Sequence, residues 1–286
     1  MGVILTAQGE IKEAVKAFEE TLRLHRTYDQ ESSLLYPLEG LGDVLQVSGD
    51  LSGAKNKLQE ALDVMRKTGQ HDSESWILAD LGDVFFAEGD FATAKSNYEK
   101  ALELDKAANL KDHLNGVRVQ LAELEMEQGQ LAEAEALTAD ALKEFEAEKS
   151  RDGQVAAYSV RMLVLSEQQR PVDAQREAEK AAKLGQGMQN RYVQTKLAIA
   201  GARVEAASGR YTEATRILDT TLAQTEKYGF LLRQYQARLA LGEIEMKTGQ
   251  VKAGRERLQS LETEATSKGF GLIARKAASA LELPAS

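Results

Sequence analysis

The sequence predicts an all-α fold, a solenoid built from stacked pairs of antiparallel helices. Three observations carry this prediction: an internal repeat of constant length, apolar spacing of helical period between turns, and only 3 prolines among 286 residues. So few prolines argue against an all-β sandwich or barrel, which needs many tight turns. Apolar residues make up 43% of the chain and charged residues 28%, so it can bury a core.

A glycine recurs at a constant interval of forty positions, without an insertion. Glutamine replaces it once, and the column reads Gly9, Gly49, Gly89, Gly129, Gln169, Gly209 and Gly249. A second column lies midway between these positions and reads Asp29, Gly69, Asn109, Lys149, Gln189, Gly229 and Gly269. Most of these residues tolerate the left-handed backbone conformation that often ends a helix. Each repeat therefore has two turns, with a helix of about 17 residues in each interval.

The intervals between the turns have helical apolar periodicity. In one of them the apolar residues fall at i, i+3, i+7 and i+10, namely Leu51, Ala54, Leu58 and Ala61. The predicted helix pairs are 32–47 with 51–67 and 72–87 with 91–108, and the same pairing continues in each further repeat. Because one pair cannot bury its own apolar stripe, neighbouring pairs must stack into a solenoid.

Several residues mark where the predicted helices begin. Asp50 and Asp90 each precede a second helix and are predicted N-caps. Pro171 stands where another second helix begins, a position that needs no N–H donor. Pro37 falls inside an expected first helix, so we expect it to delay or kink that helix.

The repeat resembles the tetratricopeptide repeat (TPR). First-helix signatures are Leu41-Gly42, Leu81-Gly82 and Leu241-Gly242, and second-helix signatures are Ala54, Leu58, Ala61 and Ala94, Tyr98, Ala101. The resemblance implies a right-handed α-solenoid of about seven helix-turn-helix repeats, with a period of forty instead of about 34. The ending LALGEIEMKTGQ further resembles the C-terminal TPR region of bacterial serine/threonine kinases or winged-helix signalling regulators, which implies fusion to an effector domain.

We interpret residues 1–286 as a single solenoid. Its predicted parts are a half repeat at 1–30, repeats near 31–70, 71–110, 111–150, 151–190, 191–230 and 231–269, and a capping helix at 270–283. Aligned by repeat, Met1 falls in the middle of a first helix, which would expose Val3, Ile4 and Leu5. This blunt start suggests a fragment of a longer protein. The capping helix, polar at Arg275 and Lys276, is expected to cover the last pair.

The sequence offers no sign of catalysis. Cysteine is absent, and the motifs typical of nucleotide binding, hydrolases and zinc proteases are missing. A G-x-G-x-x-A match at 269–274 follows a helix instead of a strand, so we reject it as a dinucleotide site. His25, His71 and His113 are interpreted as solvated or capping, and carboxylates such as Glu123 and Glu125 as a solvated face. We predict no enzyme activity, no cofactor and no metal site.

Charge and hydropathy exclude two classes of partner. The net charge of −9 has the wrong sign for direct binding to nucleic acid. No apolar run reaches the roughly 18 residues that a membrane span needs. The N-terminus lacks a secretory signal. The predicted location is cytoplasmic, with the alternative that the chain is a fragment of a membrane-anchored parent protein.

A groove is the predicted site, because first helices line the concave face of TPR arrays. By resemblance, the inward residues are Tyr36, Asp43, Trp76, Asp83, Phe86, Glu123 and Met126. The family's clamp for C-terminal carboxylates uses Lys and Asn at such positions, whereas Asp, Glu or apolar residues stand here. An acidic groove with an aromatic floor suits a basic, partly apolar segment. Alternatively, Asp43 and Asp83 belong to a common L-G-D consensus and only keep the surface hydrated.

These observations favour a non-catalytic scaffold that binds protein or peptide, as the interaction or sensing arm of a larger bacterial signalling protein. The alternative is a small-ligand or peptide sensor domain of a transcriptional regulator. Binding could also use the convex face or the exposed first half-helix instead of the groove.

Overall fold

A computed structural model describes residues 1–71 and 73–282, and all regular structure within these residues is helical. In chain order the helices are α1 (Gly2–Gln8), α2 (Ile11–Thr27), η1 (Glu31–Leu34, a 3₁₀ helix), α3 (Leu35–Ser48), α4 (Leu51–Thr68), α5 (Glu74–Glu88), α6 (Phe91–Ala108), α7 (Lys111–Glu127), α8 (Leu131–Glu148), α9 (Arg151–Glu167), α10 (Pro171–Gly185), α11 (Arg191–Ala207), α12 (Tyr211–Tyr228), α13 (Leu231–Lys247), α14 (Val251–Ser267) and α15 (Gly271–Glu282). The predicted helix pairs are confirmed to within three residues at their ends. The predicted start of one helix at Asp72 lies outside the described residues.

The turn columns behave largely as predicted. All seven positions of the glycine column have positive φ, including Gln169 with φ 59°, so this turn keeps its left-handed form without a glycine. Pro171 then begins α10, as predicted. The second column has one exception. Gln189 is not left-handed, because α10 ends early at Gly185 and Gly187 takes the positive φ of 74° instead.

The predicted helix starts are confirmed. The Asp50 carboxylate accepts a hydrogen bond from the Gly53 N–H over 2.8 Å, and Asp90 accepts one from the Thr93 N–H over 3.1 Å. Each satisfies one donor that the first helical turn leaves free. Pro37 delays its helix as expected. The 3₁₀ turn η1 comes first and α3 begins at Leu35, which places Pro37 in the first turn where no N–H is needed.

The L-G signature has a steric cause. In three repeats a glycine of the first helix faces a large buried side chain of the second, namely Gly42 with Leu58, Gly82 with Tyr98, and Gly242 with Leu258. A Cβ at Gly42 would lie 2.6 Å from Leu58 Cγ, closer than real Cβ atoms come. Glycine therefore lets the two helices of a repeat approach closely around one anchoring side chain.

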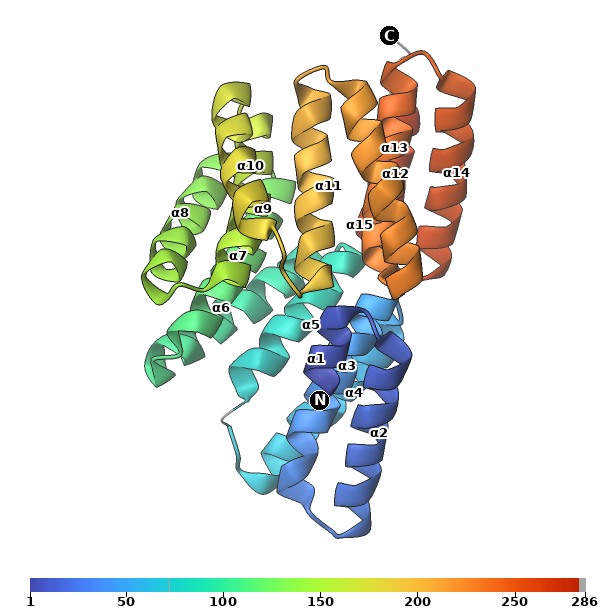
Figure 1. Cartoon of the computed structure of the whole chain (residues 1–286). Helices are drawn as coiled ribbons and strands as arrows, with labels where there is room; N and C mark the ends of the chain where they lie inside the picture. Colours follow the sequence, from blue (N-terminus) through green and yellow to red (C-terminus); the bar gives the residue numbers. More distant parts are fainter. Residues whose placement is uncertain (72, 283–286) are drawn as a thin grey trace.

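The superhelix winds back onto itself. Figure 1 shows α1–α4 lying below α11–α15, and α1 contacts α11, α3 contacts α13, and α5 contacts α15. The Arg275 guanidinium donates to the Gly89 carbonyl over 2.9 Å, and Lys276 pairs with Glu127 of α7 at 2.6 Å. The C-terminal helix was expected to cover the last pair. It packs on α14 and α13, and it also closes against α5. Leu283, the predicted end of this helix, lies outside the described residues.

The start of the chain fits the expectation only in part. Val3 and Ile4 of α1 are exposed, as the alignment by repeat predicts. The prediction for Leu5 was wrong, because its side chain is partly buried against the core beneath α2 and α3.

Candidate functional site

The wound superhelix encloses a hollow along its inner side. Two cavities of about 590 Å³ and about 350 Å³ lie there. Both are lined by side chains from α5, α7, α9, α11, α13 and α15. Their walls share Phe86, Glu123, Lys196 and Arg233, so they form one continuous space, which we call the inner cavity. First helices and α15 supply most of the lining, and Phe145 of the second helix α8 contributes to the larger part.

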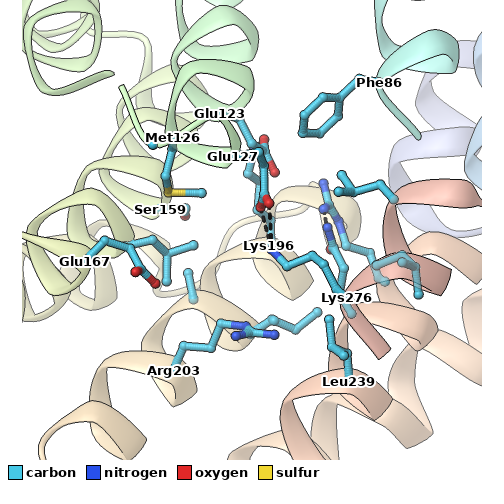
Figure 2. A pocket seen from close by; sticks show the side chains of 18 residues that line it. Phe86, Glu123, Met126, Glu127, Ser159, Glu167, Lys196, Arg203, Leu239 and Lys276 are labelled. Carbon is cyan, nitrogen blue, oxygen red and sulfur yellow. Dashed lines mark hydrogen bonds and ion pairs between the residues drawn. The ribbon is translucent and has the colours of Figure 1, made fainter. Parts of the chain in front are cut away.

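Five of the seven predicted groove residues line the inner cavity. Trp76, Asp83, Phe86 and Glu123 line its larger part, and Met126 joins Phe86 and Glu123 around the smaller part. Figure 2 shows Phe86, Glu123 and Met126 around one hollow, contributed by α5 and α7.

The other two predicted residues lie elsewhere. Asp43 is not part of the cavity lining, although it lies close enough to Asp83 for the two charges to interact. Tyr36 is 54% exposed and packs edge-on against Phe18 of α2, with ring centroids 5.9 Å apart. It lines neither cavity, so its place in the repeat did not bring it to the site.

Four carboxylates interact through their charges, and we call them the acid wall: Glu39 and Asp43 of α3, with Asp80 and Asp83 of α5. Of these, Asp80 and Asp83 line the inner cavity. Each pair is three or four residues apart and so shares a helix face. Burial, together with the charge of Asp43, raises the pKa of Glu39 to about 7. Burial and the charge of Asp83 raise the pKa of Asp43 to about 6. Within the described residues, Glu39, Asp43 and Asp80 take part in no ion pair.

The remaining two acids differ in how they are held. Burial raises the pKa of Asp80 well above its usual value, and the charges of Asp43, Glu39 and Asp83 add to this. Asp83 accepts hydrogen bonds from the Tyr98 hydroxyl at 2.5 Å and the Gln120 amide at 2.8 Å. Its pKa is raised by burial, and these two bonds oppose the rise. Asp83 is thus fixed in place, whereas Asp80 faces other acids without a cation.

Trp76 stands beside the acid wall in a fixed orientation. Its indole is 42% exposed and stacks on the His113 imidazole with ring centroids 3.6 Å apart. His113 Nδ1 in turn lies 2.8 Å from a carboxylate oxygen of the fully buried Asp105. The interpretation of His113 as solvated or capping was wrong, because this side chain is almost buried and supports the tryptophan. His25 and His71 are exposed, as expected.

Ion pairs cross the cavity on the other side. Lys196 of α11 lies 2.5 Å from the Glu123 carboxylate of α7, and Lys276 of α15 lies 2.6 Å from Glu127. Figure 2 shows Glu123 and Lys196 pointing toward each other in the middle of the hollow. Burial opposes ionisation of Glu123, but the charges of Lys196 and Arg233 outweigh it and lower its pKa.

Arg233, the third residue of α13, is only 6% exposed and lines both parts of the inner cavity. Its guanidinium lies over the Tyr192 ring, 4.3 Å from the centroid, and its Nη1 donates to Gln236 Oε1 over 2.7 Å. The inner cavity is thus lined by four cations, Lys196, Arg203, Arg233 and Lys276, and all of them except Arg233 are in ion pairs within the described part of the chain.

Glu125 corrects the expectation of a solvated carboxylate face. Its side chain is fully buried and pairs with Lys95 of α6 at 2.6 Å. Among residues 1–71 and 73–282 there is no group of three His, Asp or Glu side chains placed to hold a metal ion. None of the helices described is long and apolar enough to cross a membrane.

Sequence reasoning missed Asp80, Arg233 and Lys276. A usable signal existed for Asp80, which lies one helical turn after Trp76 on the same face, and for Arg233. The column of Trp76 continues as Gly116, Ala156, Lys196 and Gln236, and every one of these lines the cavity. Likewise, His113 and Arg233 occupy one column of the repeat, and both residues line the cavity. Lys276 had no such signal, since it lies beyond the last full repeat.

Solved structures share this fold at low sequence identity. A Rap protein complexed with Competence and Sporulation Factor has a TM-score of 0.70 and 17% identity, covering 97% of this chain and 80% of its own. The Rap conjugation gene regulator of plasmid pLS20, in complex with the Phr* peptide, has a TM-score of 0.67 and 14% identity, covering 90% and 76%. NprR in complex with its cognate peptide NprX has a TM-score of 0.65 and 12% identity, covering 95% and 82%.

Sequence comparison gives a family but no individual relative. No curated protein matches the chain. The family model described as the MalT-like TPR region matches residues 1–270. The chain therefore belongs to the MalT-like TPR region family.

Proposed function

We propose that the chain is a non-catalytic binding module whose inner cavity takes a peptide segment carrying Lys or Arg beside apolar side chains. The observation that carries the proposal is the pair of cavity-lining carboxylates Asp80 and Asp83, neither of which forms an ion pair among the described residues, next to the exposed face of Trp76. A bound ammonium or guanidinium would supply the missing charge. The indole offers a rigid apolar surface and a π face that attracts cations.

The fold supports this proposal. Two similar structures, the pLS20 Rap regulator and NprR, are complexes with peptides. We further propose that the module serves as the sensing arm of a cytoplasmic bacterial signalling protein and is fused to an effector domain. The native coding sequence around residues 1–286 tests this point, since a kinase or winged-helix domain encoded there would support it.

The test begins with a hexapeptide library, from which binders are selected by affinity and identified by mass spectrometry. We expect enrichment of Lys or Arg beside Leu, Ile or Phe. For the best binder, Trp76→Ala should weaken binding by about 2 kcal/mol or more, roughly 30-fold, measured by calorimetry. Tyr36→Ala is the matched control, because Tyr36 is an exposed aromatic outside the cavity. Enrichment of acidic peptides, or equal effects of the two variants, would contradict the proposal.

A second candidate is a small-ligand sensor domain of a transcriptional regulator. The size of the cavity favours it, since about 590 Å³ lies within the range of small-molecule pockets. Thermal-shift screens against a peptide library and a metabolite library distinguish the two candidates. A rise in melting temperature with metabolites alone would favour the sensor of small ligands.

A further inference from the structure

Arg233 is a buried cation that forms no ion pair among the described residues, although Glu123 lies close enough for the two charges to interact. Its side chain is only 6% exposed, and no carboxylate lies within ion-pair distance of it in the part of the chain that the structure describes. Buried charges in proteins are normally paired, because an uncompensated charge in a low-dielectric site is costly. The nearby carboxylates of Glu123 and Glu127 are already engaged by Lys196 and Lys276.

The guanidinium has one free edge. Tyr192 covers its face and Gln236 accepts from Nη1, whereas Nε is buried and has no hydrogen-bond partner. Arg257 shows how such an edge is used in this chain. Its Nε and Nη2 donate to the two carboxylate oxygens of Glu245 over 2.9 Å and 2.8 Å. Arg233 lines both parts of the inner cavity, so a small shift of its side chain that uncovers Nε would allow a similar two-bond contact with a carboxylate there.

We propose that Arg233 receives a carboxylate of the bound peptide. This inference rests on the proposed function and adds the orientation of the bound peptide to it. The basic side chain of the peptide lies at the acid wall of α3 and α5, and its carboxylate lies at Arg233 of α13. Two sources supply the same chemistry, the C-terminal carboxylate and an Asp or Glu side chain, and the test separates them.

The probe is the best binder from the hexapeptide library, synthesised in three forms: the free acid, the C-terminal amide, and the free acid with any Asp or Glu changed to its amide. Loss of the relevant carboxylate should weaken binding to the unmodified protein by about 10- to 100-fold. Loss with the C-terminal amide identifies the C-terminus, and loss with the side-chain amide identifies a side chain. Arg233→Met should bind all three forms equally, and Arg233→Lys should keep part of the difference.

Arg203→Met is the matched control. Arg203 also lines the cavity, but Glu243 already neutralises it at 2.9 Å, so this variant should discriminate as the unmodified protein does. Equal binding of the three forms to the unmodified protein, or discrimination that survives in Arg233→Met, would overturn the proposal while leaving peptide binding intact. Failure of every library peptide to bind would overturn the proposed function as well.

The free protein gives an independent readout. If Arg233 awaits a ligand, Arg233→Met should melt no lower than the unmodified protein without peptide, because the variant removes an unpaired buried charge. A clear fall in melting temperature would show that contacts within the free chain already satisfy the guanidinium, and the proposal would then fail.

Discussion

The two sides of the inner cavity treat their charges differently. On the acid wall, which reaches the cavity through Asp80 and Asp83, the carboxylates of Glu39, Asp43 and Asp80 form no ion pair among the described residues, and burial raises the pKa of each. On the opposite side, Lys196 and Lys276 reach acids of α7 that lie far away in the sequence. The charges of Lys196 and Lys276 are thus neutralised by acids of the chain itself. The acid wall, in contrast, lacks a positive charge, which a ligand would bring.

The difference shows what a repeat position determines. Asp43, Asp83 and Glu123 occupy the same column of the repeat. Only Glu123 has a lysine opposite, because the superhelix brings α11 across from α7. Position within the repeat sets which face a side chain lies on, whereas position along the superhelix sets its partner.

The largest expected effect comes from the packing behind the acid wall. Leu58 is fully buried and lies against Gly42, next to Asp43. Leu58→Ala removes buried methyl groups and leaves a cavity, so unfolding in urea should require about 2–5 kcal/mol less free energy.

The matched variant on the wall itself is Asp43→Ala. Asp43 has no ion pair among the described residues, and burial raises its pKa, so this change should lower the free energy of unfolding at neutral pH by no more than about 0.5 kcal/mol. Similar losses in the two variants would mean that the packing and groove faces of this repeat have been confused.

The fold could be predicted because its information is local. The turn columns and the apolar spacing each depend on residues within one repeat, and they located helices as far apart as α3 and α13. The closure of α15 against α5 could not be predicted in this way. The Arg275–Gly89 hydrogen bond joins residues 186 positions apart, and it depends on the pitch of the whole superhelix.

The placement of the candidate residues followed the repeat column only in part. The column that contains Trp76 lines the cavity at Trp76, Lys196 and Gln236. It failed at Tyr36, one repeat earlier, where the ring packs on Phe18 of α2 instead. The carboxylates were expected to be solvated, because a sequence of 45 acidic residues gives no measure of which ones the superhelix encloses.

A smaller effect is expected from breaking a pair that crosses the cavity. Lys196→Met leaves Glu123 partly buried without its cation, so we expect a loss of about 1–3 kcal/mol in urea, less than for a fully buried pair. Lys252→Met is the control, because Lys252 is exposed and lies 3.9 Å from Glu256. That change should stay within about 0.5 kcal/mol. If Lys196→Met also changes the free energy of unfolding by no more than about 0.5 kcal/mol, the two sides of the cavity do not differ as described.

The last expected effect is a pH dependence that belongs to the acid wall. The folded-state pKa values of Glu39, about 7, and Asp43, about 6, lie above the ordinary values of 4.5 and 3.8. The folded protein therefore binds these protons more tightly than the unfolded chain. The stability that these two groups contribute is complete at acidic pH, falls as pH rises through the folded values, and is lost above them.

We therefore expect the double variant Glu39→Gln, Asp43→Asn to gain stability relative to the unmodified protein between about pH 5 and about pH 8. Urea titrations at the two ends of this range measure the difference. Asp112→Asn serves as control, because Asp112 lies exposed at the edge of the cavity and outside the acid wall. A basic hexapeptide should oppose the effect, since its positive charge favours the ionised carboxylates, and its affinity should rise over the same range. A double variant whose relative stability is independent of pH would show that these carboxylates are solvated, and the contrast between the two sides of the cavity would then be lost.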